Sequence, residues 1–126
     1  MTKIQVDTFE KVQAQLEGLH LEISALSKKS QNDALNKFKL KFVNQMLKEA
    51  NQLLGENYKP FSEFDIFDEN EIPTTSDAAM MLTQYLSCFE KLRADNVKNR
   101  GGRWYWLIDG QDSDIKTITP KIVKEK

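Results

Sequence analysis

The chain has 126 residues, of which 40% are hydrophobic and 29% charged, and its formal net charge is −1. Such a length fits one domain, residues 1–126, and the small net charge argues against a protein that binds nucleic acid through its total charge. The lone cysteine, Cys88, excludes an internal disulfide and favours a cytoplasmic setting. The sequence shows neither a secretory leader nor an apolar run of about 18–20 residues, so we expect no membrane partner.

The first predicted helix spans about residues 8–27. Its apolar residues recur at steps of three and four, which places them on one stripe. They are Phe9, Val12, Leu16, Leu19, Ile23 and Leu26. Asp7, followed by Glu10, predicts a capping box at the start of this helix. The stripe is typical of a bundle helix, and the alternative is a seam between two subunits.

A second helix is predicted over about residues 32–54, with Ser30 or Asn32 as its cap and Gly55 as its stop. One apolar line contains Leu35, Phe38, Phe42, Met46 and Leu53, and it is widened by Val43, Leu47, Ala50 and Leu54. Asn44 falls on the opposite side, among lysines. The short polar break before this helix predicts an antiparallel hairpin with the first helix.

Residues 57–76 lack helical periodicity and combine two prolines with interleaved aromatic and acidic residues. Structureless connections of this length are uncommon inside a compact domain. We therefore expect an aromatic-rich crossover whose rings pack on the helices. A third helix is predicted over about residues 77–96, and it is the most apolar of the three.

The last predicted element is a β-hairpin over about residues 103–119. Alternation places Trp104, Trp106 and Ile108 on one face of its first strand, and Tyr105 and Leu107 on the other. A charged tail follows over 121–126. The predicted fold is mainly α, of the α+β class: a three-helix antiparallel bundle-like core, the crossover before the third helix, and a C-terminal β-hairpin.

Motifs of enzymatic chemistry are absent from the sequence. His20 is the only histidine, and no nucleotide-binding or zinc motif is present. Asp68 and Asn70 resemble the start of a calcium loop, but the required glycine and glutamate are missing. Asp109, Asp112 and Asp114 suit a turn. We therefore predict no catalytic residues, no cofactor and no metal.

A basic run leads into the tryptophan-rich strand and supplies the predicted binding residues. These are Lys98, Arg100, Arg103, Trp104 and Trp106. Cations beside exposed rings hold single-stranded nucleic acid, with the cations on phosphates and the rings on bases. Core packing is the favoured role for the two tryptophans, because a strand beside a helical layer buries one face.

The sequence favours a non-enzymatic protein–protein interaction or adaptor module that self-associates. Three apolar stripes, the crossover aromatics and a two-tryptophan strand give this chain more apolar surface than it can readily cover alone. We expect a homo-oligomer whose contact uses the first helix or the hairpin edge. The alternative is a small nucleic-acid-binding or regulatory protein that uses the basic runs.

Overall fold

The computed structural model describes residues 1–121 and confirms the α+β fold class. Its elements are α1 (Lys3–Ser30), α2 (Lys37–Tyr58), α3 (Thr75–Asp95), β1 (Val97–Arg100), β2 (Arg103–Ile108) and β3 (Gln111–Thr117). The strands form one antiparallel sheet in the order β1-β2-β3. The predicted tail over 121–126 lies outside the described residues except for Lys121.

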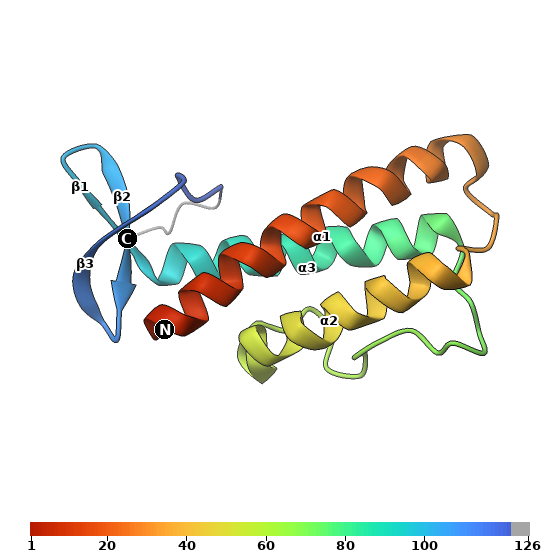
Figure 1. Cartoon of the computed structure of the whole chain (residues 1–126), viewed down its shortest axis with the longest axis horizontal. Coiled ribbons are helices and arrows are strands. Elements are labelled where there is room, and N and C mark those ends of the chain that lie inside the picture. The colour runs from red at the N-terminus through yellow and green to blue at the C-terminus, as the bar shows by residue number, and fades with distance from the viewer. Residues whose placement is uncertain (122–126) are drawn as a thin grey trace.

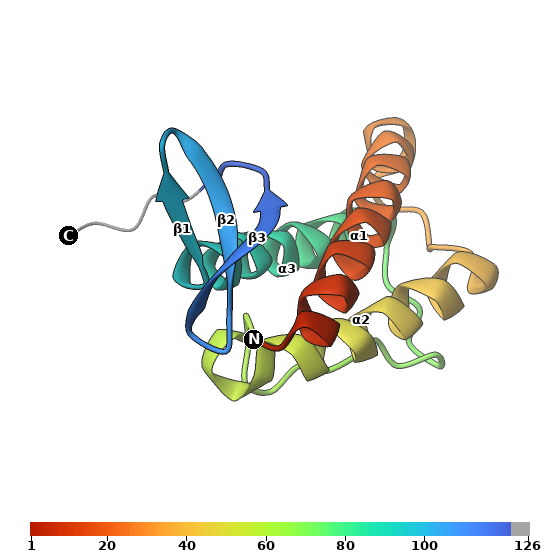
Figure 2. The ribbon, with the colours of Figure 1, turned by 60° about the vertical axis from the view of Figure 1, so that its left-hand side comes forward.

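The three helices form a bundle in which each contacts the other two, and the sheet lies at one end of it (Figures 1 and 2). α1 runs antiparallel to α2 and α3, and these two run parallel because the crossover returns the chain to the end at which α2 began (Figure 1). The sheet stands where α1 begins and α3 ends (Figures 1 and 2). At that end the backbone N–H of Asp109 donates to the carbonyl of Met1 over 2.9 Å. The sheet is therefore tied to the start of α1.

Helix α1 begins five residues before the predicted start. The predicted capping box at Asp7 is wrong, because the cap is Thr2, whose hydroxyl accepts from the backbone N–H of Gln5 over 3.1 Å. The Gln5 side chain accepts in return from the Thr2 N–H over 2.8 Å. Thr2 and Gln5 have the three-residue spacing that defines such a box, five residues earlier than expected.

Helix α2 begins later and ends later than predicted. Asn36 is its cap, and Gly55 interrupts it with a φ of 62° before a last turn to Tyr58. Leu35 is therefore buried outside the helix, and its N–H donates to the carbonyl of Pro73 over 2.9 Å. An isolated bridge pairs Ala34 with the residue after that proline. The connection between α1 and α2 is thus hydrogen-bonded to the start of α3.

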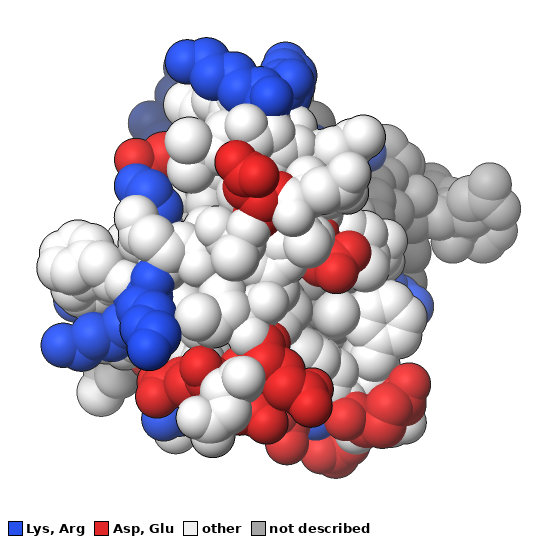
Figure 3. All heavy atoms as spheres, turned by 90° about the vertical axis from the view of Figure 1, so that its right-hand side faces the viewer, with Lys and Arg blue, Asp and Glu red and all other residues white. Residues whose placement is uncertain are grey.

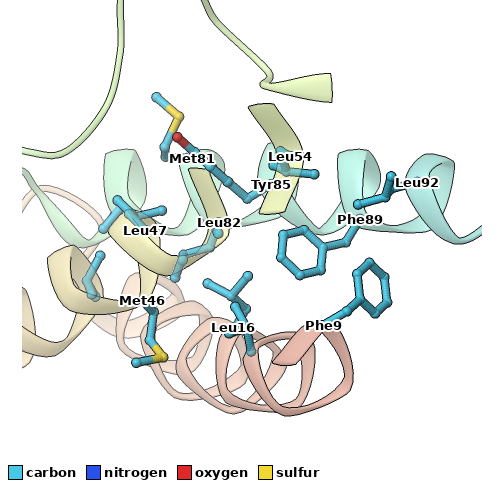
Figure 4. Close-up of a cluster of buried hydrophobic side chains, with 14 of the residues drawn as sticks. Phe9, Leu16, Met46, Leu47, Leu54, Met81, Leu82, Tyr85, Phe89 and Leu92 are labelled. Atoms are coloured by element: carbon cyan, nitrogen blue, oxygen red, sulfur yellow. The ribbon is translucent and has the colours of Figure 1, made fainter. Parts of the chain in front are cut away.

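The core lies between the three helices. The face of α2 that contributes side chains to this core agrees only in part with the apolar line predicted from the sequence. The α2 side chains that are buried are Leu40, Val43, Asn44, Met46, Leu47, Ala50 and Leu54. Leu47, Leu16 of α1 and Leu82 of α3 converge in this core (Figure 4). Phe38, which was predicted on the apolar line of α2, is instead 71% exposed.

Two asparagines of α2 hold the crossover against the helix. Asn44 donates to the carbonyl of Phe67 over 2.9 Å and accepts from its N–H over 3.0 Å. Asn51, seven residues later, donates to the carbonyl of Asp65 over 2.8 Å. The placement of Asn44 on a solvent-facing side was therefore wrong, because the side chain is buried and satisfies a backbone segment that has no regular partner.

The acidic crossover lies along α2 without neutralising its lysines. Acidic side chains gather along the lower edge of the molecule and basic ones at its upper and left edges (Figure 3). Within residues 1–121, Lys59 pairs with Asp65, whereas Lys37, Lys41 and Lys48 form no ion pair. The exposed side of α2 therefore keeps its positive charge.

The C-terminal sheet has one strand more than predicted. β1 pairs with β2 through a two-residue turn at Gly101 and Gly102, both with positive φ (62° and 84°). Asp109 and Gly110 form the second turn with φ of 51° and 77°. Positive φ at both central residues is what tight hairpin turns require. The glycine pair therefore forms the turn of an additional hairpin between β1 and β2.

Candidate functional site

Trp106 lies on the inner face of the sheet and belongs to the core. Its side chain is 0% exposed, and its ring meets Phe9 edge-on with 5.1 Å between centroids. Phe9 in turn stacks on Phe89 of α3 at 4.8 Å, and these two rings face each other across the helices (Figure 4). Trp106 offers no ring face to a ligand, so it is removed from the predicted binding residues.

A buried arginine connects this aromatic cluster to the helices. Arg93 is 1% exposed, and its guanidinium carbon lies 5.2 Å from the ring centroids of both Phe9 and Trp106. It donates to Glu90 over 3.2 Å, to Glu10 over 3.2 Å, and also to Gln13 and Thr117. The guanidinium carries five N–H donors in a rigid planar arrangement. Because these donors bond residues of α1, α3 and β3 at once, Arg93 fixes the position of the sheet relative to the helices.

Glu90 is the main anionic partner of this arginine and is itself 4% exposed. Burial alone raises the pKa of the Glu90 carboxyl. The hydrogen bonds from the N–H of Lys121 (3.0 Å) and from Gln13 (2.6 Å), with the charge and hydrogen bond of Arg93, outweigh burial and hold the pKa below its usual 4.5. Glu90 is therefore ionised at neutral pH and structural in role.

We expect Glu90→Gln to change how stability depends on pH. A carboxyl whose pKa is lowered by folding stabilises the protein above its unfolded pKa, and this contribution disappears as the pH falls through the folded value. The unfolding free energy of the parent protein should therefore exceed that of Glu90→Gln at neutral pH, and the difference should shrink below pH 4.5. Urea titrations across this range measure it, and a difference independent of pH would contradict the prediction.

The predicted cations of the basic run meet on the outer face of the sheet, around Tyr105. Strand register places Lys98 and Lys116 on either side of Tyr105. The Arg100 guanidinium lies over this ring at 4.2 Å and donates to the carbonyl of Ser113. Lys98 and Arg100 also approach two carboxylates of β3, at 3.5 and 3.6 Å. Their charge is therefore partly balanced within the sheet.

Arg103 and Trp104 lie in a groove at the open end of the sheet, beside the first hairpin turn. The groove has a volume of about 540 Å³ and is lined by Gly102, Arg103, Trp104, Lys116, Thr117, Ile118 and Thr119. Arg103 and Lys116 are exposed, and Trp104 is half-buried. No acidic residue lines this groove, and neither cation has an ion-pair partner within the described part of the chain.

A second exposed surface lies on the side of α2 that faces away from the core, next to α1. Phe38 and Phe42 contact each other edge-on at 5.0 Å, and the Lys41 ammonium lies 5.8 Å from the Phe42 ring. A groove of about 290 Å³ runs from Phe42 and Met46 to α1. Further along α2, a groove of about 240 Å³ is lined by Ile4, Gln5, Thr8, Glu49, Gln52 and Leu53. Ile4 is 78% exposed.

His20 and Cys88 are the remaining side chains of chemical interest. His20 Nε2 lies 2.9 Å from the hydroxyl of Thr83, which donates to the carbonyl of Ala79. Because that hydroxyl has a single proton, His20 is the donor. Burial raises the pKa of the Cys88 thiol despite the nearby charge of Lys91, the opposite of what an activated nucleophile needs. Among residues 1–121, no three His, Cys, Asp or Glu side chains are grouped for a metal.

Sequence reasoning missed several residues of these sites. Glu90 and Arg93 were not among the predicted site residues, yet both are charged and buried. Their i, i+3 spacing fits an ion pair and was the only available signal. Lys116 was missed because its place beside Arg103 depends on strand register, which β3 shifts by a bulge between Tyr105 and Leu107.

Comparisons with known proteins assign no role to these surfaces. Comparison with protein-family models, with curated proteins and with solved structures gives no match. No helix in residues 1–121 combines the length and apolar character needed to cross a membrane. The candidate sites consequently depend on the geometry of this chain alone.

Proposed function

We propose that this protein is a non-enzymatic protein–protein interaction module of the cytoplasm that associates with a second copy of itself through α2. The exposure of Phe38 carries the proposal, because 71% of this aromatic side chain faces solvent while the core is complete without it. Phe42 and Ile4 are also exposed, and each lines a groove between α1 and α2. Grouped exposed apolar residues mark interaction sites more often than scattered ones do.

The apolar features of this surface are arranged so that two copies can complement each other. The Phe38–Phe42 pair projects near the start of α2, and the groove between Ile4 and Leu53 lies near its end. A two-fold axis beside Gln45 would turn α2 antiparallel to its copy. The aromatic pair of each subunit would then lie over the groove of the other, as a symmetric interface requires.

Charges along α2 support the same arrangement. Lys41 and Glu49 lie four residues on either side of Gln45, so the axis brings each Lys41 next to Glu49 of the second copy. Neither residue forms an ion pair inside residues 1–121, which leaves both free for this contact. Two equivalent pairs would set the direction of the helices more than the affinity, because exposed pairs contribute only about 0.2–1 kcal/mol each.

This surface replaces the first of the two contacts expected from the sequence, the one through the first helix. The stripe of α1 that was considered as a subunit seam is buried within the chain, with Phe9, Val12 and Leu16 all inaccessible. It therefore cannot supply a seam without opening the fold. The exposed aromatic pair on α2 needs no such change.

Charge reversal tests the proposed interface. We expect the parent protein to sediment at twice the 14.6 kDa of one chain. Lys41→Glu and Glu49→Lys should each weaken association about tenfold, because each places like charges opposite each other twice. The double variant restores both pairs and should recover the parent affinity. Analytical ultracentrifugation at several concentrations measures these constants.

The matched control is Leu21→Ala, which removes a large exposed apolar side chain from another side of α1. It should leave association unchanged, whereas Phe38→Ser should abolish it while the melting temperature stays close to that of the parent. A protein that remains a monomer at hundreds of micromolar, or a double variant as weak as the single ones, would overturn the proposal.

A further inference from the structure

We propose that the groove at the open end of the sheet, defined by Arg103, Trp104, Lys116 and Ile118, binds single-stranded nucleic acid. The inference goes beyond self-association and does not depend on it, because the groove is built from β2, β3 and the residues after β3. None of these belongs to α2.

The groove combines one accessible ring with two unpaired cations. Trp104 is half-buried and packs against the core from β2, and it is one of the residues that line the groove. Arg103 precedes it in the chain, and Lys116 lies on the neighbouring strand, one residue before Thr117, the partner of Trp104. Both cations are exposed and free of ion pairs within residues 1–121.

These groups match the chemistry of a nucleotide. A base can stack on a tryptophan face whatever its identity, and the phosphates on either side of the base pair with Arg and Lys. The groove volume of about 540 Å³ is enough for a nucleotide and is the largest of the grooves described above. Its lining contains no carboxylate that would repel phosphate.

The backbone at the groove entrance allows a close approach. Gly102 has a φ of 84°, and a side-chain carbon placed there would meet no atom within 4 Å. The neighbouring outer face adds Arg100 stacked on Tyr105, so the positive surface continues along β2. The carboxylates that balance Lys98 and Arg100 are those of Asp112 and Asp114, and neither residue lines the groove, so the charged lining of the groove is positive.

A short oligonucleotide tests the proposal on the full chain. We expect twelve-residue oligodeoxythymidine to quench tryptophan fluorescence, and Trp104→Phe to remove this quenching, since Trp106 is buried. An abasic phosphodiester of equal length should bind at least about tenfold more weakly, because it cannot stack. Two phosphate contacts predict that the affinity falls with salt with a log–log slope of about −1.4.

The charge variants separate the groove from general attraction. Arg103→Ala combined with Lys116→Ala should weaken binding at least about tenfold and flatten the salt slope. Lys28→Ala combined with Lys29→Ala, which removes two exposed cations at the far end of α1, should leave binding within about twofold of the parent. Circular dichroism checks that each variant is folded.

Three results would overturn the proposal. The first is an affinity weaker than about 100 µM at low salt. The second is unchanged binding by the Arg103→Ala/Lys116→Ala protein. The third is binding of an oligoglutamate peptide as tight as that of the oligonucleotide, which would assign the groove to an acidic protein segment instead.

Discussion

Arg93→Met should destabilise the protein by about 3–5 kcal/mol. The change keeps most of the side-chain volume but removes the cation that pairs with Glu90 over 3.2 Å inside the core. Glu90 would then be a buried carboxylate held only by Gln13 and the N–H of Lys121. Breaking one side of a buried pair costs more than the pair contributes, because the remaining charge stays desolvated. Urea unfolding at neutral pH measures the loss.

A double substitution distinguishes this explanation from lost packing. If the uncompensated charge dominates, Glu90→Gln added to Arg93→Met should recover part of the stability, giving a coupling energy of about 0.5–3 kcal/mol. Arg93→Lys keeps the charge but not the fork, and it should fall between the parent and Arg93→Met. Additive losses in the double variant would show that Arg93 acts through its other contacts, such as those with Phe9 and Trp106, and not through Glu90.

Trp106→Ala should cost about 3–5 kcal/mol and loosen the sheet from the helices. Trp106 is the largest fully buried side chain, and it fills the space between the sheet and the Phe9–Phe89 pair. Its Nε1–H also donates to Glu10 of α1 over 2.9 Å. Removing the indole leaves a cavity and breaks one of the links between the first helix and the sheet.

Hydrogen exchange and thermal unfolding should locate this damage. Amides of β1 and β2 should lose protection more than those of α2, because α2 does not contact the sheet through this ring. Trp106→Phe retains a ring and loses the hydrogen bond to Glu10, so it should be less destabilised than Trp106→Ala. Uniform loss of protection over helices and strands would contradict the expected local effect.

The sequence predicted an element correctly where the apolar residues that recur with the period of a helix or strand are also the residues buried in the structure. The stripe of α1 is a clear case, since Phe9, Val12, Leu16 and Ile23 recur at helical spacing and are all buried. The inner face of β2 is another, because alternation alone separates Trp106 from Tyr105. These features follow from local geometry, which needs no knowledge of neighbouring segments.

Tertiary structure decided which of two apolar faces of α2 enters the core. Phe38 and Phe42 are as apolar as Leu40 and Leu47, yet the leucines are buried in the core and the two rings are exposed. Hydrophobicity cannot choose between two such faces, because the choice depends on where α1, α3 and the crossover lie. The crossover also turns Asn44 inward, since Phe67 needs a partner for its backbone groups.

The burial of charged residues likewise could not be predicted from the sequence. Glu90 and Arg93 have the composition of a solvated helix end, and they are buried because β3 and Lys121 cover them with matching hydrogen bonds. The sequence by itself determined three helices and the inner face of a C-terminal strand. Only the tertiary structure determined the buried ion pair, the exposed face of α2 and the groove at Trp104, because each depends on segments distant in the chain.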